Sequence, residues 1–190
     1  ELMRQWEYIF GRRDEAEFVT VGQVKSKAEI VMATPPEDHP LVGEIIVDHA
    51  LEISENPGKE YVIIVAHGAS GRDRDQDNPK ELEILKTLAR YVKEDGGFAD
   101  VGYVTLQDDA PAEIRDANVA RLRAMAEGAV KQGQTVLVVT NLIGTRTIQP
   151  KIRADLKGID YKFNAKGIAQ HANFIEWIQE TVGDALEKSG

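Results

Sequence analysis

The sequence predicts an α/β fold in which a parallel sheet carries helices on both faces, and two observations predict it. First, residues 61–66 and 135–140 are apolar runs with little polar alternation, which is typical of strands buried on both faces. Second, from residue 61 onward such runs alternate with helical patterns that end at glycine. This alternation requires parallel strands joined by right-handed crossovers, as in flavodoxin-like folds.

The first sixty residues carry fewer regular patterns than the rest. Residues 2–10 space their apolar side chains as a helix does, and a glycine follows. The charged stretch 12–27 predicts a loop or a weak hairpin, and 28–33 predicts a short strand before a Pro-Pro turn. An amphipathic helix is expected from His39 to the Asn-Pro-Gly sequence at 56–58.

From residue 78 onward, the residues that start and end helices are easier to recognise. Asn78, Pro79 and Glu81 combine a helix cap, a first-turn proline and a third-position acid, which predicts that a helix begins at Asn78. This helix is expected to end at Gly96. Three further helices are expected over 111–132, 148–156 and 171–187, and two further strands over 100–106 and 161–164.

The start of the chain resembles its end. An apolar helical pattern follows both His39 and His171, at an offset of 171 − 39 = 132 residues. A period of that size corresponds to one α/β repeat and not to a solenoid unit. We therefore predict that residues 1–57 are the C-terminal remnant of a first repeat and that 58–190 form a complete second repeat. The alternative is that any two strand–helix units look alike.

Composition and charge exclude several classes of partner and site. The formal net charge of −9 argues against nucleic acid and against an anionic membrane surface, which would both repel the chain. The lack of cysteine excludes disulfides, zinc–thiolate sites and a thiol nucleophile. No apolar run approaches the roughly 20 residues of a membrane-spanning helix. No signal peptide is visible, so the cytoplasm is the expected compartment. The periplasm stays open, because the chain opens at Glu1 without the upstream segment.

Polar residues gather where the predicted strands end. His67 directly follows the first apolar strand, at the carboxyl edge where open α/β sheets bind ligands. Gly68 lets backbone approach whatever the imidazole contacts. Asp108, Asp109 and the loop 141–147 follow the two other strands and are expected at the same edge. The alternative for His67 is a hydrogen-bonded loop histidine without chemistry.

The second repeat resembles the class II chelatases, in particular the sirohydrochlorin cobaltochelatase and ferrochelatase group. The resemblance covers about residues 60–190 and rests on the strand-His-Gly-small-Ser motif at 62–70, the acidic turn at 108–111, and the strand and loop at 135–147. It implies a chelatase-like fold and a lyase activity that inserts cobalt or iron into a sirohydrochlorin-type tetrapyrrole, as in siroheme and cobalamin biosynthesis.

The resemblance also implies roles for single residues. In that family the first-strand histidine binds the metal, which falls here on His67. Members usually bring a second histidine from the loop after the third strand, and Thr147 stands at the best-matching position. One imidazole is a weak site unless carboxylates assist. His171, at the start of a helix on the same edge, is a second candidate ligand, although loop packing explains it as well.

The other candidate residues each have a chemical and a structural interpretation. Either Asp108 or Asp109 acts as proton acceptor or transient ligand, or the pair caps the helix that follows. Arg146, with Asn141 and Thr147, binds substrate carboxylates through a guanidinium fork, or Arg146 is a surface arginine.

The expected ligands are a divalent metal as substrate (cobalt, nickel or iron) and a tetrapyrrole, without an organic cofactor. The expected partner is an upstream repeat half or a second copy of the chain. The alternative to a chelatase is a non-catalytic scaffold half that binds metal or tetrapyrrole and has lost the second histidine.

Overall fold

The computed structural model describes residues 2–17 and 19–189. Its helices are α1 (Leu2–Ile9), α2 (Pro40–Leu51), α3 (Arg74–Gly96), α4 (Ala112–Lys131), α5 (Gln149–Asp155) and α6 (Ala172–Ser189), with short 3-10 turns η1 (Pro57–Lys59) and η2 (Ile168–Gln170). Its strands are β1 (Glu60–Ala66), β2 (Asp100–Thr105), β3 (Thr135–Asn141) and β4 (Lys162–Phe163).

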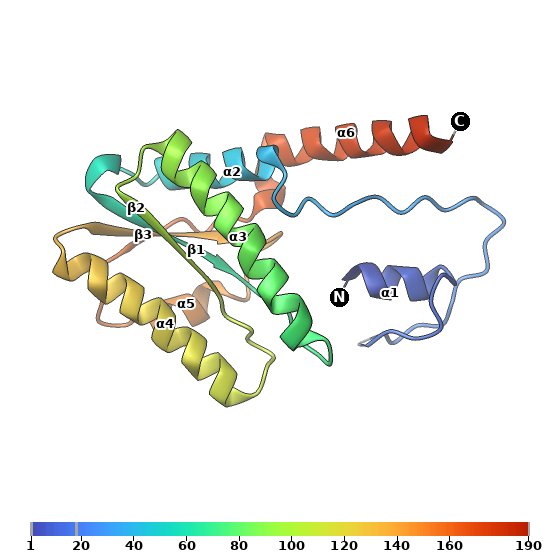
Figure 1. Cartoon of the computed structure of the whole chain (residues 1–190), viewed down its shortest axis with the longest axis horizontal. Helices are drawn as coiled ribbons and strands as arrows, with labels where there is room; N and C mark the ends of the chain where they lie inside the picture. The colour runs from blue at the N-terminus through green and yellow to red at the C-terminus, as the bar shows by residue number, and fades with distance from the viewer. Residues whose placement is uncertain (1, 18, 190) are drawn as a thin grey trace. The chain divides into compact units, whose positions relative to one another are not determined.

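The four strands form one parallel sheet in the order β2-β1-β3-β4. Figure 1 labels the first three of them. β1 lies in the interior of the sheet, where Tyr61 stands opposite Asp100 of β2 and Val136 of β3. Residues 62–66 of β1 are at most 1% exposed, as the continuous apolar run predicts for a strand covered on both faces.

Helices cover both faces of this sheet. Val62 and Ile64 pack into a core with α2 and α3, whereas Ile63 and Val65 pack into a second core with α4 and α5. Successive side chains of a strand point to opposite faces, so β1 contributes to both cores. The predicted parallel α/β fold with helices on both faces is confirmed.

The chain divides into two compact units. The larger unit, residues 36–177, contains the sheet, and the smaller unit contains residues 1–35 and 178–190. In the smaller unit, α1 stacks Trp6 on Phe10 with ring centroids 5.6 Å apart, and Val24 donates its backbone N–H to Ile9 O at 2.7 Å.

Two predicted elements were wrong in type or in bounds. Residues 28–33 form no strand, because their side chains are mostly exposed and no neighbouring strand pairs with them. α3 begins at Arg74 and not at Asn78, which lies inside the helix. Asp75 and Asp77 occupy its first turn, where the helix dipole favours negative charge. The Asn78 amide oxygen instead accepts the backbone N–H of Ala69 at 3.2 Å.

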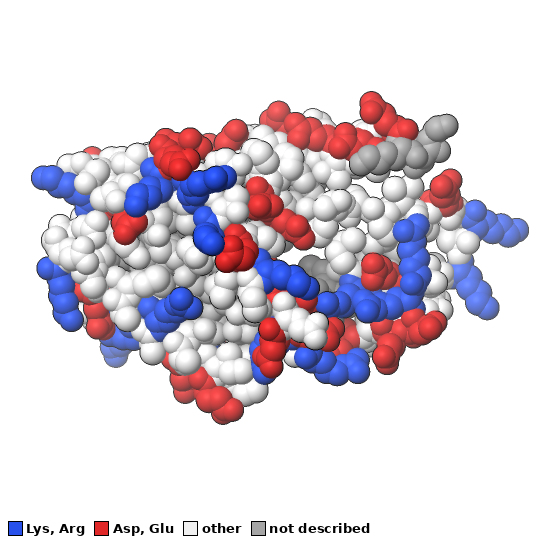
Figure 2. Space-filling model, in the orientation of Figure 1, with Lys and Arg blue, Asp and Glu red and all other residues white. Residues whose placement is uncertain are grey.

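The surface agrees with a chain of mixed charge. On the face drawn in Figure 2, acidic and basic side chains are intermingled and are not sorted by sign. Within residues 2–17 and 19–189, no helix combines the length and the apolar character that crossing a membrane requires.

Candidate functional site

A pocket of about 220 Å³ opens at the carboxyl edge of the sheet, beside the ends of β1, β2 and β3. Four of the candidate residues predicted from the sequence line it: His67, Asp108, Asp109 and Thr147. The other lining residues are Leu142, Gly144, Ile148 and Lys151. The prediction that polar groups from three strand ends share one edge therefore holds for these four residues.

His67 presents its ring nitrogen Nε2 to the pocket, and in the neutral ring the lone pair of this nitrogen is free. The ring Nδ1 lies 2.8 Å from the carbonyl oxygen of Gly68. A carbonyl can only accept, so Nδ1 carries the proton and Nε2 is the unprotonated nitrogen of the neutral ring. The side chain is 47% exposed. The imidazole is therefore oriented by its own loop and is open to a ligand.

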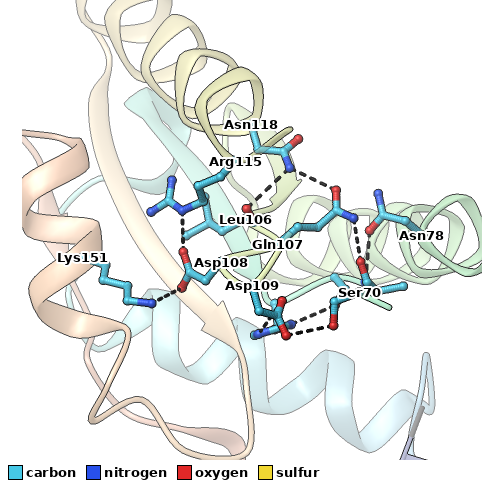
Figure 3. A network of polar contacts seen from close by, with 12 residues as sticks. Ser70, Asn78, Leu106, Gln107, Asp108, Asp109, Arg115, Asn118 and Lys151 are labelled. Atoms are coloured by element: carbon cyan, nitrogen blue, oxygen red, sulfur yellow. Dashed lines mark hydrogen bonds and ion pairs between the residues drawn. The ribbon is translucent and has the colours of Figure 1, made fainter. Parts of the chain in front are cut away.

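Asp109 faces this lone pair. Its Oδ1 lies 3.6 Å from His67 Nε2, and its Oδ2 accepts a hydrogen bond from the Ser70 hydroxyl at 2.9 Å (Figure 3). In the neutral tautomer, the carboxylate oxygen and the ring nitrogen are both electron-pair donors. Bonds of about 2.1 Å from one divalent ion to both atoms would subtend roughly 120° at the ion, which is near the tetrahedral angle. The pair thus has the spacing of two ligands of a single cation.

Asp108 is held differently although it is the adjacent residue. Its side chain is 9% exposed and forms ion pairs with Arg115 and, at 3.2 Å, with Lys151. Figure 3 shows both of these ion pairs. Arg115 of α4 also bonds Asp155 of α5 at 2.6 Å, which links the two helices. α4 begins after Pro111 without a side-chain cap, so the cap interpretation of this turn is not what the structure has. The Asp108 carboxylate is thus buried between two cationic side chains and is engaged by both of them.

Asn141 and Arg146 lie in the loop after β3 but are not among the residues that line the pocket. Asn141 ends β3 opposite Ala66, and Arg146 is exposed beside Thr147. The neighbouring Thr145 hydroxyl donates to Ala165 O, and Thr140 donates to Lys166 O at 3.2 Å. These bonds fix the loop as a wall of the pocket.

His171 lies outside the pocket lining. Its Nε2 is 3.1 Å from Asp48 Oδ2, its Nδ1 accepts the backbone N–H of Asn173 at 3.2 Å, and its ring meets His49 edge-on at 5.8 Å. The structure thus brings His67 together with Asp109 and sets His171 in a separate contact between α2 and the start of α6.

Sequence reasoning missed two residues of this region. Lys151, which is half exposed, is the cationic group of the pocket lining, and Gln107 is buried at 4% exposure beneath the His67 loop. Lys151 lies four residues after Thr147, one helical turn along, so the start of α5 was a signal for it. Nothing in the sequence marked Gln107 apart from its place directly after the predicted strand.

Comparison with known proteins adds information on the fold. No family model matches the chain, and no curated protein matches it. Among solved structures, the chain is similar to SirB from Bacillus subtilis with Fe³⁺, with a TM-score of 0.59 and 16% sequence identity. The match covers 82% of this chain and 57% of the SirB chain, so the protein spans little more than half of that structure. This similarity confirms the chelatase-like fold.

Proposed function

We propose that this chain is a chelatase-like lyase that inserts a divalent metal ion, cobalt or iron, into a sirohydrochlorin-type tetrapyrrole. The observation that carries the proposal is the facing pair of electron-pair donors, His67 Nε2 and Asp109 Oδ1, 3.6 Å apart in an open pocket. The sequence resemblance to class II chelatases and the fold similarity to an iron-containing structure support it independently.

The small number of ligands suits an ion that is substrate and not a resident cofactor. Among residues 2–17 and 19–189, no group of three or more His, Asp or Glu side chains is arranged to hold a metal. A closed structural site uses four protein ligands, whereas two ligands leave coordination positions open for pyrrole nitrogens. The ion is therefore held weakly enough to be handed over.

The same two residues can also accept the protons that insertion releases. When the ion bonds to the ring, two pyrrole N–H groups lose their protons, and the ion leaves His67 Nε2 and the Asp109 carboxylate. Both atoms then have a free lone pair, so one proton can go to each. Asp108 stays with Arg115 and takes no part.

The ring is expected to bind by one edge. A cavity of about 220 Å³ is smaller than the 300–1,000 Å³ or so of typical small-molecule sites, so it takes the ion and part of the macrocycle. In this proposal Lys151 of the lining and Arg146, which is exposed in the loop after β3, bind substrate carboxylates, and Thr147 of the lining contacts the ring. Asn141 at the end of β3 completes the proposed binding residues.

The test is cobalt or nickel binding to His67→Ala, measured by calorimetry. We expect the affinity for the ion to fall by more than the roughly 100-fold upper range for groups that only support a ligand. His171→Ala is the matched control, because it removes an imidazole outside the pocket and should keep the native affinity. Unchanged affinity in His67→Ala would remove the metal assignment.

A second candidate function is a metal- or tetrapyrrole-binding scaffold without turnover. It is favoured by Thr147, which lines the pocket at the position where the resemblance expects a second histidine. The variant Thr147→His separates the two functions in an insertion assay that follows the absorbance of a metal-free tetrapyrrole. If only the variant inserts metal, the native chain is the binder; if the native chain already does so, it is the enzyme.

A further inference from the structure

Gln107 joins the two loops that carry His67 and Asp109. It is the second residue after β2, and its side chain is 4% exposed. Its backbone has φ of +48°, a left-handed conformation that is uncommon for a residue with a side chain. Strain of this kind persists only where surrounding contacts fix it. The chain turns here, and two residues later it presents Asp109 to the pocket.

A relay of amide hydrogen bonds fixes the orientation of the Gln107 side chain. Asn118 of α4 donates from Nδ2 to Gln107 Oε1 at 3.0 Å, and Gln107 donates from Nε2 to Ala69 O at 2.6 Å (Figure 3). Because Asn118 occupies the amide oxygen, the NH₂ group can only face Ala69. The direction of the relay therefore runs from a helix behind the sheet to the His67 loop.

The backbone of the same residue supports the loop a second time. Gln107 donates its N–H to His67 O at 2.6 Å. Gly68 packs so closely that a Cβ there would lie 2.5 Å from Thr105 Cβ and 2.9 Å from Gln107 Cγ. The loop thus rests directly on Gln107 and the end of β2.

We infer that Gln107, oriented by Asn118, is a positioning residue that sets the His67 Nε2 and the Asp109 carboxylate at the spacing of two metal ligands. The inference rests on the proposed function, since it names residues that serve the same site. Gln107 touches neither the ion nor the ring. It donates hydrogen bonds to the carbonyl oxygens of His67 and Ala69. Its left-handed backbone turns the chain so that Asp109 lies at the pocket.

The test compares two variants that leave both proposed ligands in place. Gln107→Leu removes the two side-chain hydrogen bonds at similar volume, and Asn118→Leu removes the donor that orients Gln107 from outside the pocket. Loss of groups that orient a metal ligand lowers metal affinity by about 10- to 100-fold. We expect cobalt affinity to fall by about tenfold or more in both variants.

Asn164→Ala is the matched control for a loss of stability. Asn164 is a comparably buried amide at 6% exposure, and it donates to His49 O and to Glu52, each at 2.8 Å, away from the pocket lining. This variant should lose stability but keep the native cobalt affinity. Circular dichroism and thermal melting of all three variants identify any that fail to fold.

A second readout needs no metal. Nitrogen NMR of the imidazoles in the metal-free protein should show His67 protonated on Nδ1 in the native chain and a mixture of tautomers in both relay variants. Folded variants with native affinity and native tautomer would overturn the positioning role. A native chain that binds no cobalt would instead overturn the proposed function, and the imidazole spectra would still decide whether Gln107 orients His67.

Discussion

Two histidine–aspartate pairs in this molecule are similar in spacing and opposite in chemistry. His171 Nε2 lies 3.1 Å from Asp48 Oδ2, and His67 Nε2 lies 3.6 Å from Asp109 Oδ1. Distance alone would assign both pairs the same role. The difference lies at the other ring nitrogen, which is hydrogen-bonded to a different backbone group in each case.

In the first pair, His171 Nδ1 accepts the backbone N–H of Asn173 at the start of α6. The proton of the neutral ring is therefore on Nε2, and it is donated to Asp48. In the second pair, His67 Nδ1 donates to Gly68 O, so Nε2 keeps its lone pair. The first pair is a satisfied hydrogen bond, whereas the second pair faces the pocket with no proton of the neutral ring between its two atoms.

The backbone beside each imidazole thus decides which nitrogen of the neutral ring carries the proton. An imidazole that precedes a helix meets a free N–H group and becomes a donor through Nε2. His67 instead precedes Gly68, whose φ of +82° is readily adopted only by glycine. We therefore propose the metal role for His67 with Asp109, and a structural role for the His171–Asp48 contact.

The largest effect on stability is expected at Asp108, which differs from the adjacent Asp109 in being buried and ion-paired. In Arg115→Met, Asp108 and Asp155, which are 9% and 15% exposed, lose their shared cation. Breaking a buried ion pair from one side costs about 3–5 kcal/mol, so we expect the free energy of unfolding to fall by that amount in urea titrations. Lys151→Met should cost less, because its side chain is 50% exposed. Equal stability of Arg115→Met and the native chain would contradict the structural role of Asp108.

A smaller effect is expected from Asp109→Asn, which tests the open pair directly. The amide keeps the shape and an oxygen for Ser70 but loses the charge that faces the ion. We expect cobalt affinity to fall by about tenfold, which corresponds to about 1.4 kcal/mol. Asp48→Asn is the control, since the same change in the satisfied pair should leave cobalt affinity unchanged. If both variants bind cobalt like the native chain, the chelate assignment of Asp109 is wrong.

The sequence was sufficient for the sheet but not for the bonds that distinguish the two pairs. The apolar runs at 61–66 and 135–140 carry their own evidence of double burial, so the strands and their common edge were predictable. The strand predicted at 28–33 was wrong because pairing depends on a neighbour that the local pattern does not reveal.

The site was predictable only in part for a similar reason. His67, Asp108 and Asp109 were found because they directly follow strands. That Arg115 neutralises one aspartate and not the other depends on where α4 and α5 pack. The predicted duplication of the chain stays a prediction. In its favour, His39 Nδ1 accepts Leu41 N–H at 3.3 Å, as His171 does at Asn173, so the two histidines 132 residues apart (171 − 39) begin their helices alike.

The smallest expected effect is a pH dependence of stability that comes from His49, whose ring contacts His171. Burial lowers the pKa of His49 below its usual 6.5, while Glu52 and Asp48 oppose this shift and His171 and Lys166 add to it. The unfolded chain then binds a proton that the folded chain resists, so stability should be complete above about pH 6.5 and decline as the pH falls from there towards the lowered pKa. Thermal melting of His49→Leu should show a shallower decline than the native chain over this window, with comparison at pH 8 isolating the packing change. An equally steep decline in the variant would assign the effect to other groups.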